Sequence, residues 1–381
     1  MAKITSGVRV VGFLLLGLWA VGCSAGAVDD EPELQLGDAN PGLSAERLLA
    51  FERGKALFER RFKLSDGHGP DFNTSSCSAC HEFPVTGGSS PLYRNFFLAR
   101  DAAGQNFFEG NQLVARTFSY VRPIRESMAG ATTIAQRNSP PIFGVGEFER
   151  IRDFDILVNE DPDDSNRDGI SGRVNRDDGL VGRFGYKAQE SGIEDFIRGP
   201  IFNHMGITTN PLSFASQLAQ VPSTGEPTKD NDAAPDPEMP RADLEDLFVW
   251  VRELAGPQPL PMDTEALRGE ALFSSIGCGK CHIKNLATTG APINAYTDLL
   301  IHDMGPTLAD GIAMSLASGS EFRTQPLWGL RHHAPYLHDG RADTIEDAIL
   351  AHAGEGQQSR DKFNSLSAAN RAAVLSFLET R

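Results

Sequence analysis

Hydrophobic side chains recur at helical spacing in two pairs of segments. Arg53–Phe58 and Arg268–Phe273 each place Leu and Phe on one face of a helix. Ala242–Leu254 and Ser367–Thr380 are amphipathic, and each closes one half of the chain. Sustained alternation of polar and apolar residues is absent from the sequence, so little β structure is expected. The pattern predicts a mainly α fold with long loops, built from two similar halves.

The repeat also includes the loops between these helices. A CxxCH motif follows the first helix of each half, at Cys77–His81 and at Cys278–His282. Arg137–Gly144 then follows the first motif, and the similar Arg323–Gly329 follows the second. Helix, CxxCH, irregular loops and closing helix, present twice, predict two tandem cytochrome c-like domains. We expect a signal peptide at residues 1–22, a flexible tether at 23–44, and domains at 45–257 and 263–381.

The N-terminus predicts export. An uncharged apolar run, Val10–Val21, follows two basic residues and is too short to span a bilayer as a stable helix. Ala20–Cys23 resembles the cleavage box of bacterial lipoproteins, which would make Cys23 a lipid anchor; ordinary cleavage within Ser24–Ala27 is the alternative. Both readings place the protein in the bacterial periplasm or cell envelope.

The net charge limits the choice of partners. The 381 residues carry a formal charge of −16, and loss of the leader removes two cations, giving −18. An acidic protein is a poor ligand for nucleic acid and is suited to a small, basic redox protein.

The two CxxCH motifs carry the chemistry. Two thiols separated by two residues can add to the two vinyl groups of one haem, and the adjacent His then becomes the proximal iron ligand. A thioredoxin-like site needs no following His, zinc ribbons rarely separate their halves by about 200 residues, and a disulfide across this spacing is strained. Two covalent haem c groups are predicted, held by Cys77, Cys80, His81, Cys278, Cys281 and His282.

Further motifs resemble a known family. Pro335–Gly340 followed by Thr344–Ile349 resembles a signature of bacterial di-haem cytochrome c peroxidases and of the maturation enzyme of methylamine dehydrogenase. Other details are most similar to the di-haem oxidoreductase family: Asp168–Arg173, Gly182–Ala188, Met205–Thr208, Leu299–Gly305 and His338–Ala342. The resemblance runs from about residue 45 to the C-terminus. It implies haem-to-haem electron transfer and chemistry on hydrogen peroxide, and the relatives are commonly dimers.

The resemblance implies a sixth ligand for the second haem. In the peroxidases this ligand is a Met twelve residues beyond the HDG glycine, and the corresponding residue here is His352. Its helical spacing from Ala348 and Ile349 places all three on one face. Met304, Met314 and His338 are the alternatives. Imidazole in place of thioether would lower the haem potential.

The first haem is expected to be open. Between His81 and Met128 the sequence contains neither His nor Met. The resemblance implies His204 as a distal acid/base, with ligation by His204 as an alternative and Glu194 as a weaker acid/base candidate. It also implies an aromatic side chain between the haems near Phe184 or Tyr186.

An acidic turn predicts a calcium site. Asp164, Asn166 and Asp168 place oxygen ligands at every second position and are followed by Gly169. This pattern is typical of the first half of a calcium-binding loop, but Asn175 replaces the closing Glu of an EF-hand. A solvated acidic turn is the other interpretation.

Two functions from different classes fit these motifs. The first is an enzyme that reduces hydrogen peroxide, or uses it to oxidise a partner, at an open haem on His81. The second is a non-enzymatic relay with two closed haems, in periplasmic respiration or metal reduction. Thiol oxidoreduction is disfavoured because haem attachment would consume all four internal cysteines.

Overall fold

The computed structural model describes residues 34–92, 95–101, 114–115, 118–120, 130–209 and 233–381. Residues Leu34–Arg381 form one compact unit. The predicted signal peptide and Cys23 lie outside the described residues. Within those residues, no helix is long and apolar enough to cross a membrane.

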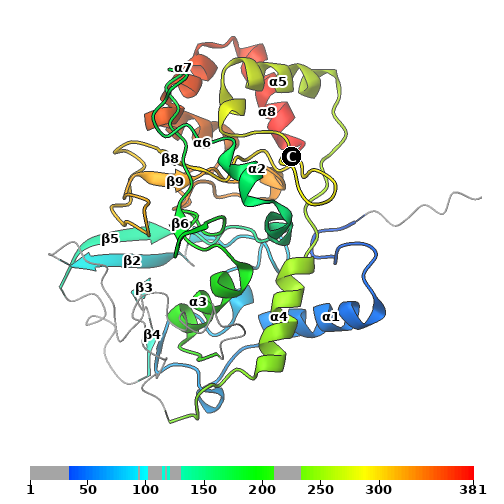
Figure 1. Cartoon of the computed structure of the whole chain (residues 1–381), viewed down its shortest axis with the longest axis vertical. Helices are drawn as coiled ribbons and strands as arrows, with labels where there is room; N and C mark the ends of the chain where they lie inside the picture. Colours follow the sequence, from blue (N-terminus) through cyan, green and yellow to red (C-terminus); the bar gives the residue numbers. More distant parts are fainter. Residues whose placement is uncertain (1–33, 93–94, 102–113, 116–117, 121–129, 210–232) are drawn as a thin grey trace, which may run out of the picture. The chain divides into compact units, whose positions relative to one another are not determined.

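Helices provide most of the regular structure (Figure 1). Their bounds are α1 Ala45–Glu59, α2 Asp153–Leu157, α3 Ile193–Met205, α4 Arg241–Glu253, α5 Thr264–Ser275, α6 Ile345–Ala351, α7 Gln357–Ser365 and α8 Ala368–Glu379. The helices predicted before each CxxCH and at the end of each half are confirmed as α1, α5, α4 and α8. Caps explain several starts, because Ser44, Asp263 and Ser367 each accept a backbone N–H of the first turn.

In the described ranges the strands are short and form four small antiparallel sheets. Their bounds are β1 Asp71–Phe72, β2 Phe96–Asp101, β3 Val114–Ala115, β4 Phe118–Ser119, β5 Ala131–Arg137, β6 Arg176–Asp177, β7 Leu180–Val181, β8 Ile301–Asp303 and β9 Glu321–Arg323. The burial of β5 alternates along the strand, which pairs with β2, although its sequence does not alternate between polar and apolar residues. The small size of the sheets agrees with the little β structure expected from the sequence.

The two halves repeat the same helix crossing. Glycines at equivalent positions, Gly54 and Gly269, bring α1 against α4 and α5 against α8 (Figure 1). A phenylalanine one turn further along each helix contacts the CxxCH histidine: Phe58 lies 5.9 Å from His81, and Phe273 lies 6.2 Å from His282, both at 54° between ring planes. The repeated sequence therefore positions both CxxCH motifs in the same way.

Two hydrophobic clusters lie behind these crossings. One surrounds Trp250 of α4 and the other surrounds Phe377 of α8. The two domain boundaries predicted from sequence stay a prediction. Residues 38–40, at the end of the predicted tether, pair with residues 253–255 after α4, and the earlier part of that tether lies outside the described residues.

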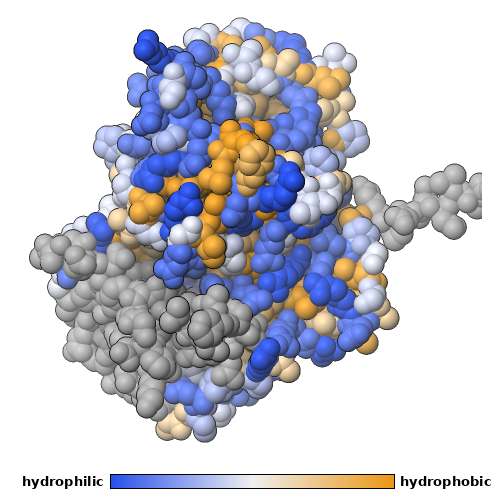
Figure 2. Space-filling model, in the orientation of Figure 1, coloured by the Kyte–Doolittle hydropathy of each residue, from blue (hydrophilic) through white to orange (hydrophobic). Residues whose placement is uncertain are grey.

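The face of the molecule seen in Figure 2 is mainly hydrophilic, with an apolar area near its middle. Exposed apolar side chains of the described residues include Phe154 of α2, which is 67% exposed, and Val158 just after this helix.

Candidate functional site

Each CxxCH motif forms a tight 3₁₀ turn at the end of a helix–loop segment. The turns are Cys77–Ala79 and Cys278–Lys280. Each histidine N–H donates to the carbonyl of the first cysteine, at 3.2 Å for His81 and 3.0 Å for His282. The turn keeps both thiols and the imidazole within one short loop, as attachment to a single ring requires.

The four internal cysteines form no disulfide and are half-buried. Burial raises the pKa of Cys77 and of Cys278 to about 12. A redox dithiol needs thiolate at neutral pH, so this environment disfavours one. Neutral, buried thiols are compatible with consumption in thioether bonds.

The two CxxCH histidines are held in one tautomer. Nδ1 of His81 donates to the Gly88 carbonyl at 3.1 Å, and Nδ1 of His282 donates to the Tyr296 carbonyl at 2.9 Å. A carbonyl can only accept, so the ring proton lies on Nδ1 and the lone pair on Nε2. This backbone bond is the usual support of a metal-binding histidine. Burial also lowers the pKa of both rings to about 4, which keeps them neutral.

A pocket with mostly apolar walls adjoins the second CxxCH. Its lining includes Cys278, Cys281, His282 and, from the end of α6, His352. His352 is the C-cap residue of α6 and lies one residue beyond the end of the helix. It therefore does not share a helical face with Ala348 and Ile349 as the sequence predicted. Its Nδ1 donates to the Ala348 carbonyl at 2.7 Å, which again leaves the lone pair on Nε2.

The residues of this pocket fit a haem c. Two thiols, a proximal imidazole and a second imidazole line one cavity, and His352 is close enough to His282 for its charge to contribute to the lowered pKa of His282. Met304 lines the same pocket and remains an alternative ligand. Met314 instead accepts a hydrogen bond from Arg137 at 3.6 Å. His338 also lines the pocket and is buried, and its ring stacks on Phe322 at 4.2 Å.

His204 lies near the first CxxCH histidine. It is on the last turn of α3, where Phe96 of β2 contacts its ring edge-on at 4.9 Å. Burial, and then the charge of His81, lower the pKa of His204 to about 4. The Asn73 side-chain amide lies 3.4 Å from its Nδ1. An amide offers either a donor or an acceptor when it rotates, so Asn73 can support both neutral tautomers.

Glu194 is not brought to His204. The two residues are ten positions apart on α3, which is about 15 Å along a helix axis. Glu194 accepts a hydrogen bond from Arg252 of α4 at 3.0 Å, and Arg252 also pairs with Glu149. Glu194 therefore takes part in an ion-pair network that joins α3 to α4.

The predicted inter-haem aromatics have different surroundings. Tyr186 is buried and lines the C-terminal pocket. Phe184 stacks on Phe196 at 5.7 Å and lies 6.4 Å from Phe148, which stacks on Trp328 at 5.2 Å. Phe148 and Trp328 were not predicted to lie beside Phe184. The Trp-Gly end of the second loop was an available signal for Trp328, and the sequence around Phe148 offered none.

The predicted calcium residues bond to their own loop. Asp164 accepts the Asp168 and Gly169 N–H groups, and Asn166 also accepts the Asp168 N–H. Asp168 accepts the Ile170 N–H and pairs with Lys280 at 3.0 Å. Calcium binding here stays a prediction.

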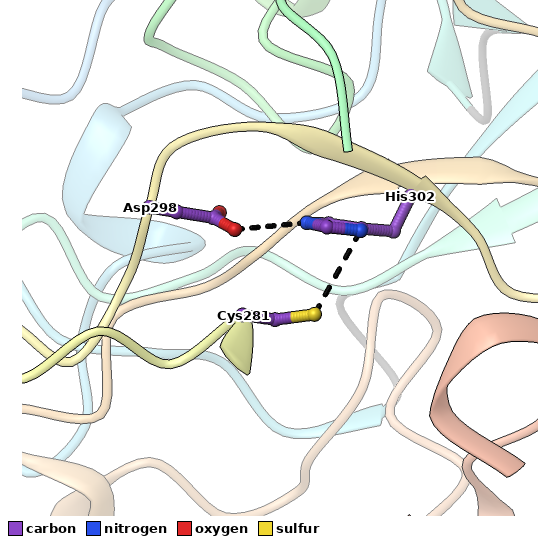
Figure 3. A group of neighbouring side chains, drawn as sticks. All are labelled: Cys281, Asp298 and His302. Carbon is purple, nitrogen blue, oxygen red and sulfur yellow. Dashed lines mark hydrogen bonds and ion pairs between the residues drawn. The ribbon is translucent and has the colours of Figure 1, made fainter. Parts of the chain in front are cut away.

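A buried polar cluster behind Cys281 was missed by the sequence analysis. Figure 3 shows His302 between Asp298 and Cys281, with its ring nitrogens 2.9 Å from the Asp298 carboxylate and 3.7 Å from the sulfur. Burial opposes charge on His302, but hydrogen bonds to Asp298 and Glu355 hold its pKa well above the usual value. A protonated ring has no lone pair for a metal, so this group is a hydrogen-bonded support.

Glu355 lies in the loop that follows His352 and connects this loop to the cluster through hydrogen bonds. It accepts from His302 at 2.7 Å and from the N–H and hydroxyl of Ser171 at 3.0 and 2.8 Å. Burial would raise its pKa, yet the His302 bond lowers it to about 2. In the sequence, only the histidine of the Leu299–Gly305 motif indicated this role.

Comparison with known proteins identifies the family. Residues 126–381 match the family described as "Di-haem oxidoreductase, putative peroxidase". The chain belongs to this family. The match begins after the first CxxCH and includes the second, and it confirms the resemblance drawn from the sequence motifs.

Individual relatives are more distant. "Methylamine utilization protein MauG" of Methylorubrum extorquens is 29% identical over 130 residues, which cover 30% of this chain and 34% of that protein. The chain thus matches about a third of the length of this curated relative.

Solved structures with a related chain trace include the di-haem peroxidase BthA of Burkholderia thailandensis, with a TM-score of 0.44 and 15% identity, covering 91% of this chain and 87% of that one. A "MauG-like protein associated with microbial copper homeostasis" has a TM-score of 0.42 and 17% identity, with 92% and 94% covered. Hydrazine synthase of Kuenenia stuttgartiensis has a TM-score of 0.44 and 14% identity, with 99% and 100% covered.

Proposed function

We propose that this di-haem oxidoreductase carries two covalent haem c groups and reduces hydrogen peroxide, or uses it to oxidise a partner, at the site of His81. The observation that carries the proposal is the contrast between the two second histidines. His352 gives its Nδ1 proton to a backbone carbonyl and keeps a lone pair on Nε2. His204 faces the Asn73 amide, a group that carries both a donor and an acceptor, at 3.4 Å from its Nδ1. The first arrangement suits a permanent ligand, and the second suits a group that gives and takes a proton.

At the C-terminal site, His282 and His352 would be the two axial ligands. Two imidazoles close the iron to exogenous ligands and favour its ferric state relative to a thioether ligand. This haem would then store and pass electrons, and Glu355 and His302 would hold the loop that carries His352. Met304 is the alternative ligand.

At the N-terminal site, His81 would bind the iron and His204 would act as the distal acid/base. Reduction of one peroxide consumes two electrons and two protons and yields two waters, and the haems would supply the electrons. The chain must move a proton between the two peroxide oxygens, and a neutral His204 can accept it at pH 7 because its pKa is about 4. Phe96 packs against this ring at 4.9 Å between centroids.

We also propose export to the periplasm with a lipid anchor at Cys23, a small soluble redox protein as electron donor or acceptor, and assembly as a homodimer. Support comes from the apolar leader and from the net charge of −16, which favours a basic partner. Calcium at Asp164, Asn166 and Asp168 belongs to the same set of proposals.

Electron paramagnetic resonance of the resting ferric protein, followed by mixing with peroxide, tests the enzyme proposal. We expect one high-spin and one low-spin signal, two covalent haems per chain, and turnover with a reduced donor. Two low-spin signals, with neither cyanide binding nor peroxide reaction, would instead establish the relay function. The closeness of His204 to His81 is the observation that favours this second candidate, because ligation by His204 would close the first iron.

A further inference from the structure

The C-terminal pocket contains a buried cation that lacks a counter-ion. Arg323, the last residue of β9, is 8% exposed and lines this pocket. Its Nε donates to the Gly185 carbonyl at 2.9 Å, and Nη2 donates to the Gln325 side chain at 2.9 Å. Its Nη1 is buried and finds no hydrogen-bond partner among the described residues. Within the same part of the chain, no carboxylate lies within ion-pairing distance of it.

The equivalent arginine in the first half of the chain, Arg137, shows why the lack of a counter-ion at Arg323 is unusual. Arg137 ends β5 as Arg323 ends β9, and each begins a segment of the form Arg-x-x-Pro. Arg137 is also buried but pairs with the buried carboxylate of Asp310 through both Nε and Nη2. Asp298, whose charge acts on Arg323, is bonded to His302 instead. The ion pair with Asp310 neutralises Arg137, whereas Arg323 has no such pair among the described residues.

A second unpartnered polar group lies beside Arg323. The hydroxyl of Tyr186 is buried, lines the same pocket and has no hydrogen-bond partner among the described residues. The two residues are joined directly, because the Arg323 N–H donates to the Tyr186 carbonyl at 2.7 Å. Nε2 of His333, on another part of the pocket lining, is also buried without a partner in the described chain. Buried donors of this kind are costly unless a ligand satisfies them.

The missing partner must be an anion that accepts hydrogen bonds from a guanidinium and a phenol. A carboxylate meets both conditions, since it matches the planar fork of arginine and accepts a further bond from a hydroxyl. A haem carries two propionate carboxylates on the half of the ring opposite its vinyl groups. The cysteines that would take the vinyl groups are on the Cys278–Lys280 turn and just after it, whereas Arg323 and Tyr186 come from β9 and the loop that it pairs with.

We propose that Arg323 and Tyr186 form a carboxylate site that binds a propionate of the C-terminal haem. This inference rests on the proposed function, because it needs a haem attached at the second CxxCH. The bound propionate would neutralise the guanidinium, satisfy Nη1 and fix the rotation of the ring within the pocket. Removing the cation would leave the propionate charge uncompensated and so stabilise ferric iron.

The test compares Arg323→Gln and Tyr186→Phe with a control, Arg371→Gln. Arg371 is a partly exposed cation of α8, 3.8 Å from Glu346, and is not part of the pocket lining. The haem count is measured first, by mass and by the pyridine haemochrome spectrum. We expect two covalent haems in the wild type and the control. Fewer in the wild type would defeat the proposed function itself, whatever the role of Arg323.

With both haems attached, redox titration and resonance Raman spectroscopy decide the inference. We expect Arg323→Gln to lower the midpoint potential of the low-spin haem and to shift its propionate bending bands. Tyr186→Phe should shift the bands and change the potential less, and Arg371→Gln should change neither. If Arg323→Gln fails to fold or to load, Tyr186→Phe decides alone.

Two results would overturn the inference. One is an unchanged potential and unchanged propionate bands in each variant that retains both haems. The other is a wild-type potential that moves when small carboxylates are dialysed away, with the propionate bands constant, because the bound anion would then be a free carboxylate.

Discussion

Replacing Gly269 by Ala should open the helix crossing that positions the second CxxCH. A Cβ at this position of α5 would lie 1.9 Å from the Ala373 carbonyl oxygen of α8 and 2.8 Å from the Cβ of Phe377. Ordinary contact begins at 3.4 Å, so α5 and α8 must separate by about 1.5 Å. The obstructing atom is backbone, and a side-chain rotation cannot relieve it.

The size of the effect follows from two opposing contributions. Overpacking of a well-packed core costs about 1–3 kcal/mol. Alanine is favoured over glycine inside a helix by about 0.5–1 kcal/mol. We therefore expect a net loss of about 1–2 kcal/mol in the free energy of unfolding, and the same for Gly54→Ala, whose Cβ would lie 2.1 Å from the Asp246 carbonyl oxygen.

Urea unfolding of the haem-loaded protein, followed by far-ultraviolet circular dichroism, measures this loss as a lower midpoint at constant slope. Leu267→Ala is the control, because that side chain on α5 is 53% exposed and its loss should change stability by less than about 0.5 kcal/mol. A Gly269→Ala protein as stable as the wild type would refute the reasoning, since it would mean that the helices do not meet at this glycine.

Three further predictions concern the sites and their protonation. His352→Ala should convert the low-spin ferric signal to high-spin and allow cyanide to bind at the C-terminal haem; an unchanged signal would assign the ligand to another residue such as Met304. His204→Gln should lower kcat for peroxide by about 10²–10⁴-fold with both haems attached. Wild-type activity should fall as the pH drops through about 4, because His204 becomes protonated there. A change of spin state in His204→Gln, in place of lost turnover, would show that His204 is a ligand. Burial, then nearby acidic groups led by Asp177, raise the pKa of Glu190 to about 8. The folded protein therefore holds a proton that the unfolded chain releases above about pH 4.5, and stability should fall as the pH rises from 4.5 to 8. Glu190→Gln should remove this loss, so equal pH dependence of the unfolding midpoint in both proteins would contradict the assignment.

The sequence by itself determined the parts of the site that are local. In each CxxCH, two cysteines and a histidine lie within five residues, so the covalent chain already brings them together. The helices before and after each motif follow from apolar periodicity and capping residues. The predicted ends of α4 and α8 lie within one residue of the observed ones, whereas α1 and α5 begin eight and four residues before the segments that predicted them. The family follows from the same local motifs.

Tertiary structure alone decided what faces those motifs. His204 and Asn73 are 131 residues apart, and His302 and Glu355 are 53 apart. The contrast between paired Arg137 and unpaired Arg323 depends on Asp310, which is 173 residues beyond Arg137. Apolar periodicity and motif spacing do not predict these long-range contacts. The contacts form because separate segments bury apolar surface against one another, and this packing brings their polar groups together. The chain thus specifies where each ring would be attached, and the packing specifies how each one is surrounded.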